Sequence, residues 1–155
     1  MNAPKVTVVI TTYNRPKMLS KAISSVLNQT LQDIEIIVVD DVSTEDNAAV
    51  IDSFGDKRIT LIRNETHLGG AIGRNVGAAA GQSGEWIAFL DDDDLFLPDK
   101  LERQVALGVT LDDDYAVIDS ESIQVGDRIV ASDLKKAPLG ESLEQDRIEE
   151  VFAPE

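Results

Sequence analysis

Four short apolar runs, each followed by a segment with helical spacing of its apolar residues, occupy the first 110 residues of this chain. The first run, at residues 5–11, is β-branched and almost uninterrupted, which is typical of a parallel strand that is buried on both faces. Regular alternation of strand and helix requires crossover connections between parallel strands. The sequence therefore predicts an α/β fold, with an open, mostly parallel, doubly wound sheet and helices on both faces.

The predicted elements follow from these runs and from helix-start signals such as proline at a first helical position. The second predicted helix begins within residues 43–46 and is lined by Ala48, Ala49 and Ile51. Strands are expected at 5–11, 34–40, 58–63 and 84–90, and helices from Pro16, from 43–46, over 69–81 and from Pro98. Later in the chain we expect a strand at 115–119, a strand pair within 122–131 and a helix at 141–152.

The fourth run, Trp86–Leu90, reads as another strand buried on both faces, and it ends in four consecutive carboxylates, Asp91–Asp94. At an effective dielectric near 20, each close pair of these charges repels by about 4 kcal/mol at about 4 Å before screening. Proton uptake, full solvation or a hard divalent cation could offset this repulsion. An EF-hand loop is excluded, because Phe96 stands where its glycine is required.

Polar residues follow three of the predicted strands. They are Thr11–Asn14, Asp40 with Asp41, and Asp91–Asp94. A single aspartate at a strand end is usually a turn or cap residue. If the three strands are neighbours, however, these side chains meet at the carboxyl edge of the sheet, where open α/β sheets bind ligands.

Composition limits the possible partners. The formal charge of −15, from 29 acidic and 14 basic residues, argues against a nucleic-acid backbone or an anionic membrane as the partner. The chain has no cysteine, and no apolar run approaches the length of a membrane span. We therefore expect a single cytoplasmic domain over the 155 residues.

The glycines of residues 69–77 match neither a dinucleotide fingerprint nor a P-loop, and they indicate close packing of a helix on the sheet. Arg74 is different, because a guanidinium near the strand ends could bind a planar base or a phosphate. His67, the only histidine, reads as a structural loop residue rather than a ligand or base.

Four motifs, in order over about residues 5–105, resemble the family-two nucleotide-sugar glycosyltransferases. They are Val8–Arg15, Val38–Thr44, Gly69–Gly77 with Arg74-Asn75, and Phe89–Asp94 followed by Pro98 and Lys100-Leu101-Glu102.

The resemblance implies a GT-A-type domain that binds a nucleotide sugar, most often a UDP-sugar, with Mn²⁺ or Mg²⁺. Thr11, Thr12, Tyr13 and Asn14 would border the uracil, Asp40 would accept a hydrogen bond from it, and Arg74 would lie against the nucleotide. The family's D-x-D falls on Asp91 and Asp93. Asp93 would coordinate the metal, and Asp91 or Asp92 would reach the ribose or a metal-bound water.

The chain departs from the family pattern in two respects. Val42 stands where the family usually has a small or polar residue, and a β-branched residue disfavours positive φ. The family's downstream general base also has no convincing counterpart, since Asp112–Asp114 follow too closely and Glu149-Glu150 lie on an expected surface helix. We therefore expect residues 1–155 to be the donor-binding part of a longer inverting enzyme, with the base beyond Glu155 and a glycan, lipid-linked or other acceptor.

Two other interpretations remain. The chain could be a non-catalytic module that binds a nucleotide sugar or a metal. It could also transfer a phosphoryl group with Asp91 or Asp93 as nucleophile, although in haloacid-dehalogenase-like enzymes the acid follows the first strand and Thr or Val takes the place of Leu95.

Overall fold

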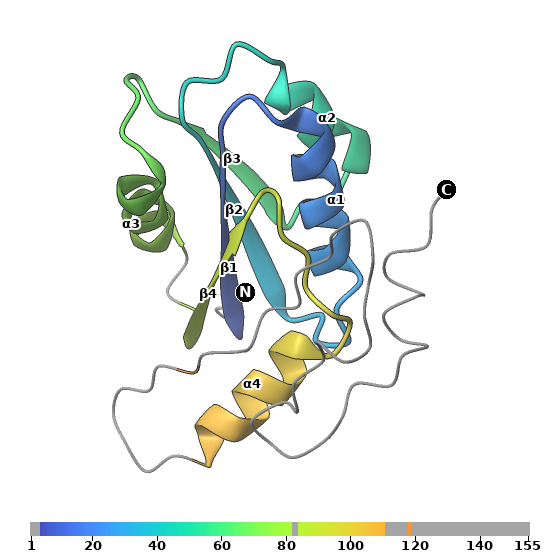
Figure 1. Cartoon of the computed structure of the whole chain (residues 1–155). Helices are drawn as coiled ribbons and strands as arrows, with labels where there is room; N and C mark the ends of the chain where they lie inside the picture. The colour runs from blue at the N-terminus through green and yellow to red at the C-terminus, as the bar shows by residue number, and fades with distance from the viewer. Residues whose placement is uncertain (1–3, 82–83, 111–117, 119–155) are drawn as a thin grey trace, which may run out of the picture. The chain divides into compact units, whose positions relative to one another are not determined.

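The computed structural model describes residues 4–81, 84–110 and 118. Within them the chain forms four strands and four helices in strict alternation, as the sequence predicts (Figure 1). The elements are β1 (Val6–Thr12), α1 (Pro16–Leu27), β2 (Ile34–Asp40), α2 (Asn47–Phe54), β3 (Ile59–Arg63), α3 (Gly70–Ala80), β4 (Trp86–Asp91) and α4 (Lys100–Val109).

The described strands form one parallel sheet in the order β3-β2-β1-β4. Helix α3 lies on one face of the sheet, and α1 and α2 lie on the other (Figure 1). This arrangement confirms the predicted α/β fold with helices on both faces. It also explains why β1 and β2 read as nearly continuous apolar runs, because both of their faces are covered.

The larger core lies between the sheet and α1. Alternate residues of β1 and β2, including Val8 and Ile36, pack there against Leu19 and Ile23, and all four are fully buried. Burial of each such side chain contributes about 1.5–3 kcal/mol. A smaller core on the opposite face joins Val9, Ile37 and Val39 to Val76 of α3.

The expectation that β4 is buried on both faces is wrong. Ile87 and Phe89 are 48% and 46% exposed, whereas Leu90 of the same strand is buried. The reason is topological: β4 pairs with β1 at one end of the described sheet, and α3 packs over β1 and β2. An apolar run alone does not reveal that one face of its strand is left uncovered.

Local sequence signals predicted most helix boundaries to within two residues of their positions in the structure. Pro16 begins α1 as predicted, and Asp46 caps α2 by accepting a hydrogen bond from the Ala49 N–H at 3.1 Å. The predicted inner face of α2 is wrong in part, because Ala48 and Ala49 are exposed. Val50, Ile51 and Phe54 pack against the larger core instead.

The chain divides into two compact units, Met1–Ala106 and Leu107–Glu155. The strand expected at 115–119, the strand pair within 122–131 and the helix at 141–152 lie outside the described residues, apart from position 118. Across the described ranges, no helix combines the length and the apolar character that a membrane crossing needs.

Candidate functional site

The polar residues that follow β1, β2 and β4 meet at the carboxyl edge of the sheet. In the strand register, Thr12 pairs with Asp40 of β2, and Thr11 pairs with Asp91 of β4. Strand β1 therefore stands between two carboxylate-bearing strand ends. This convergence was expected on condition that the three strands are neighbours, and the sheet order meets that condition.

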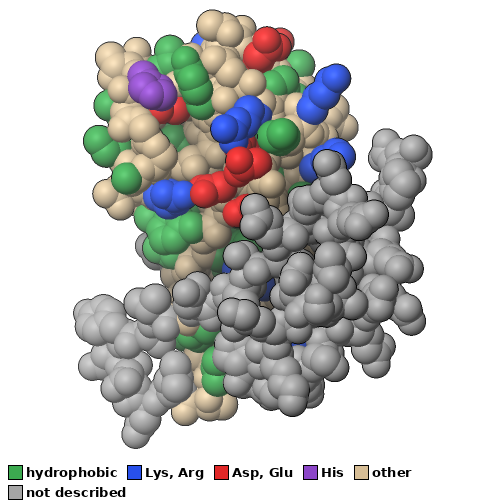
Figure 2. Space-filling model, viewed as in Figure 1, with side chains coloured by type: hydrophobic (Ala, Val, Ile, Leu, Met, Phe, Trp, Pro, Cys, Tyr) green, Lys and Arg blue, Asp and Glu red, His purple; other side chains and the backbone are tan. Residues whose placement is uncertain are grey.

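Two arginines lie among the four consecutive aspartates. Arg74 of α3 forms an ion pair with Asp91, and Nη1 of Arg15 lies 3.1 Å from Asp92 and 2.7 Å from Asp93. Figure 2 shows acidic side chains gathered beside basic ones on one face of the molecule. Guanidinium groups thus offset part of the repulsion, whereas the sequence predicted an offset by protons, water or a metal.

The four aspartates have different surroundings. Asp92 is 5% exposed and accepts hydrogen bonds from Thr12 Oγ1 at 2.8 Å and from Arg15. Asp93 and Asp94 are exposed, and Asp91 is partly buried. Burial, together with the negative charges of Asp93 and Asp91, raises the pKa of Asp94 above its ordinary value of 3.8.

Three of these acids could share one cation. Asp91, Asp93 and Asp94 each offer a carboxylate oxygen within 4.8 Å of the other two. A set of carboxylate oxygens suits the hard cations Mg²⁺ and Mn²⁺. The chemistry of this donor set therefore fits the metal that the resemblance implies, with Asp94 as a third candidate ligand in addition to Asp91 and Asp93.

A second network shapes the loops after β1 and β2. Asp40 is 1% exposed, and its Oδ1 accepts a hydrogen bond from the Ser43 N–H at 2.9 Å. The side-chain Oδ1 of Asn14 accepts a hydrogen bond from the Thr44 N–H at 2.7 Å, and the backbone N–H of Asn14 donates to Ser43 Oγ at 2.8 Å. Asn14 therefore ties the two loops together, a role that its side-chain chemistry allows but its sequence position does not reveal.

Asp41 organises the loop that leads into α3. Its carboxylate accepts hydrogen bonds from Asn64 Nδ2, Leu68 N–H and Gly69 N–H, each at 2.8 Å, and lies 2.9 Å from Nδ1 of His67. Burial alone would raise the pKa of Asp41, but these hydrogen bonds and the charge of His67 outweigh it and hold the pKa below 3.8. This role of Asp41 was not predicted from the sequence.

Tyr13 and His67 meet above this network. Their ring centroids are 4.8 Å apart with a tilted geometry, and Tyr13 is 49% exposed. The histidine lies next to an acidic side chain on the face shown in Figure 2. His67 is thus held in the loop by Asp41, in agreement with its interpretation as a structural loop residue.

Backbone conformation at the site is unusual at two residues. Asn14 and Val42 have φ values of 56° and 66°, in the left-handed region. Asparagine tolerates this region, whereas a β-branched residue there is strained. The departure noted at Val42 therefore coincides with a position that glycine or asparagine would occupy more easily.

Comparison with known proteins gives a consistent result. Residues 7–150 match the profile of Glycosyl transferase family 2. The UDP-Glc:alpha-D-GlcNAc-diphosphoundecaprenol beta-1,3-glucosyltransferase WfgD of Escherichia coli is 40% identical over 102 residues, which are 66% of this chain and 40% of that protein. The GalNAc(5)-diNAcBac-PP-undecaprenol beta-1,3-glucosyltransferase of Campylobacter jejuni is 41% identical over 96 residues, which are 61% of this chain and 31% of that protein.

Solved structures share the fold. S. aureus TarS 1-349 in complex with UDP superposes with a TM-score of 0.61 and 29% identity, over 66% of this chain and 31% of that one. The matched region spans less than half the length of each of these proteins.

Proposed function

This chain belongs to glycosyl transferase family 2, and we propose that it forms the donor-binding part of a metal-dependent, inverting glycosyltransferase that uses a UDP-sugar. The observation that carries the proposal is the meeting of three polar strand ends at one edge, with two arginines among the acids. The similarity to TarS, whose structure holds UDP, supports uracil as the base.

The proposed roles follow the surroundings of each residue. Tyr13 offers an exposed ring on which a base can stack. Oδ1 of Asp40 already accepts a hydrogen bond from the Ser43 N–H, so the uracil N3–H would donate to Oδ2. Because Asp40 is nearly buried, contact between uracil and Oδ2 requires local opening of the structure. Thr11, Thr12 and Asn14 would border the base. Thr12 also donates a hydrogen bond to Asp92, and Asn14 joins the loops after β1 and β2.

We assign the cation, Mn²⁺ or Mg²⁺, to Asp93 with Asp91 and Asp94. A cation held there would supply positive charge that stabilises the diphosphate of the leaving nucleotide. Asp91 is also the acid proposed to reach the ribose, because Asp92 is buried and committed to Thr12 and Arg15. Arg74, which pairs with Asp91, would lie against the nucleotide and contact its phosphates.

The acceptor and the general base remain predictions. WfgD and the Campylobacter enzyme carry acceptors with undecaprenol diphosphate in their names, and a lipid-linked acceptor is accordingly proposed here. We propose that the base lies outside residues 1–155, because the acids described here serve the metal and nucleotide side, whereas an inverting displacement needs a carboxylate on the face opposite the leaving nucleotide. The single-domain organisation and the cytoplasmic location also stay predictions.

Calorimetry with UDP, with and without Mn²⁺, tests the proposal. UDP should bind much more tightly when Mn²⁺ is present, because the acids otherwise repel the diphosphate. Asp93→Ala should remove this metal dependence while the unfolding curve stays unchanged, and Asp52→Ala, at an exposed position of α2, is the matched control. UDP affinities that are equal with and without Mn²⁺ would remove the metal from the proposal.

A further inference from the structure

Arg15 joins two acids that lie far away in sequence. It is the last residue before α1, and its Nη1 donates to Oδ1 of Asp92 at 3.1 Å and to Oδ2 of Asp93 at 2.7 Å. The partners are 77 and 78 residues away. One guanidinium nitrogen therefore serves two neighbouring carboxylates at the edge of the sheet.

The two contacts differ in how easily they break. Asp92 is 5% exposed and is held by Thr12 Oγ1 at 2.8 Å, so it is a fixed anchor for the arginine. The side chains of Arg15 and Asp93 are 50% and 49% exposed, and ion pairs of this kind are weak and screened by salt. Arg15 can therefore release Asp93 and remain tethered to Asp92.

Asp93 has a second use. It is one of the three acids whose oxygens lie close enough to share a cation. A divalent cation there would lie beside the positive charge of Arg15, and like charges at close range oppose each other. In the ligand-free chain, Arg15 and a cation therefore compete for the same carboxylate.

A diphosphate changes this balance, because it adds negative charge that both a cation and a guanidinium can contact. We propose that Arg15 is an internal counter-ion of Asp93, which weakens cation binding in the ligand-free chain and thereby makes cation and diphosphate binding depend on each other. This inference rests on the proposed function, and Arg15 acts through Asp93 as a positioning residue.

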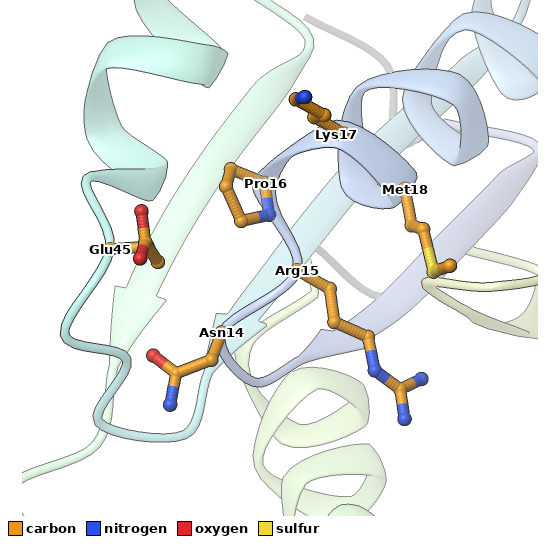
Figure 3. Close-up of a pocket in the computed structure, with 6 residues that line it drawn as sticks. All are labelled: Asn14, Arg15, Pro16, Lys17, Met18 and Glu45. Atoms are coloured by element: carbon orange, nitrogen blue, oxygen red, sulfur yellow. The ribbon is translucent and has the colours of Figure 1, made fainter.

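The chain offers a matched control in Lys17. Figure 3 shows the hollow lined by Asn14, Arg15, Pro16, Lys17, Met18 and Glu45, where the side chains of Arg15 and Lys17 extend away from each other. Lys17 is exposed, carries the same charge and lies in the first turn of α1. Arg15→Gln and Lys17→Gln change the net charge equally, but only the first removes the partner of Asp93.

The test measures Mn²⁺ binding by the 155-residue chain, by electron paramagnetic resonance of free Mn²⁺ and by calorimetry, with and without UDP. Without UDP, Arg15→Gln should bind Mn²⁺ about 5- to 10-fold more tightly than wild type, an effect within the usual range of coupling between sites. Lys17→Gln should differ from wild type by less than about 2-fold. Arg15→Lys, which keeps the charge, should stay near wild type.

The coupling gives an internal check. The factor by which UDP strengthens Mn²⁺ binding must equal the factor by which Mn²⁺ strengthens UDP binding. Both factors should fall together in Arg15→Gln and be kept in Lys17→Gln. Far-ultraviolet circular dichroism confirms that each variant is folded.

The outcomes separate the two ideas. If wild type binds no UDP in either condition, the proposed function fails, and the comparison of Mn²⁺ affinities without UDP still decides the role of Arg15. If wild type couples Mn²⁺ and UDP but Arg15→Gln behaves as Lys17→Gln does, the inference about Arg15 is wrong and the proposed function stands.

Discussion

The Cβ atom that an alanine would place at position 77 lies 2.3 Å from Cγ1 of Val9. No real Cβ makes so short a contact, so helix α3 approaches β1 as closely as the missing side chain allows. Arg74 lies one turn earlier on the same helix. The close approach therefore helps to place its guanidinium beside Asp91.

Gly77→Ala should destabilise the chain. Overpacking costs about 1–3 kcal/mol, which exceeds the gain of up to about 1 kcal/mol from the better helix propensity of alanine. Urea unfolding should rank three variants by their added contacts, with Gly77→Ala worst, Gly73→Ala (3.1 Å from Thr11 Cγ2) next and Gly70→Ala (3.9 Å from Arg74 Nη1) nearly neutral. Equal stability of all three would contradict the close packing.

Val42→Asn should stabilise the chain by about 0.5–1 kcal/mol, because the φ of 66° costs a β-branched residue more than it costs asparagine. Thermal unfolding measures the change. Val50→Asn, at a partly buried position within α2, should destabilise instead. A loss of stability at both positions would show that the left-handed backbone at Val42 is not strained.

Asp41→Asn should cost about 1–3 kcal/mol at neutral pH, because the amide NH₂ would face a donor, either the Gly69 N–H or the Leu68 N–H. The pKa of Asp41 is lowered in the folded chain, so its contribution is complete above pH 3.8 and is lost as the pH falls through the lowered pKa.

The difference in unfolding free energy between wild type and Asp41→Asn should therefore shrink as the pH falls below 3.8. Urea titrations at several pH values measure it. Asp52→Asn removes the same charge at an exposed position of α2, and its unfolding free energy should differ little from that of wild type at any pH. A gap between wild type and Asp41→Asn that widened in acid would reverse the assigned sign.

Asp40→Asn should narrow the preference for UDP over CDP. Wild type should prefer UDP, since N3 of cytosine carries no proton and would face a carboxylate acceptor. The variant keeps an oxygen for the Ser43 N–H and loses a charged hydrogen bond worth about 1.5–3 kcal/mol. Competition calorimetry with both nucleotides measures the ratio, and equal affinities in wild type would remove Asp40 from base recognition.

Much of the fold was predictable because its signals are local. Apolar runs placed the strands, Pro16 and the 43–46 segment placed helix starts, and the glycines of 69–77 predicted the close packing now found at Gly73 and Gly77. The exposed face of β4 was not predictable. Strand order depends on pairing between distant segments, and periodicity does not encode which strand stands at the end of the sheet.

The candidate site, like the fold, was predictable from the sequence only in part. Residues at strand ends could be found from the sequence, because parallel strands deliver them to one edge. Arg15 and Asp41 could not be assigned their contacts, since an arginine before a helix and a second aspartate after a strand look ordinary. Their partners lie between 23 and 78 residues away, and only the folded chain brings them together.

The place of β4 in the sheet also bears on the order in which the chain folds. Strand β4 carries the acids, and it pairs with β1, whose Val6 meets Trp86 across 80 residues of sequence. Strand pairs that are near each other in sequence, such as β1 with β2, require the closure of shorter loops and form earlier. We expect β4 to dock last, so the acids are gathered only after the rest of the sheet exists.

Leu90→Ala should accordingly speed unfolding and leave the refolding rate nearly unchanged, whereas Ile36→Val in β2 should slow refolding. Stopped-flow kinetics in urea distinguish the two effects. For a chain with a formal charge of −15, late docking means that the repulsion among Asp91–Asp94 acts on the final step of folding and spares the nucleus.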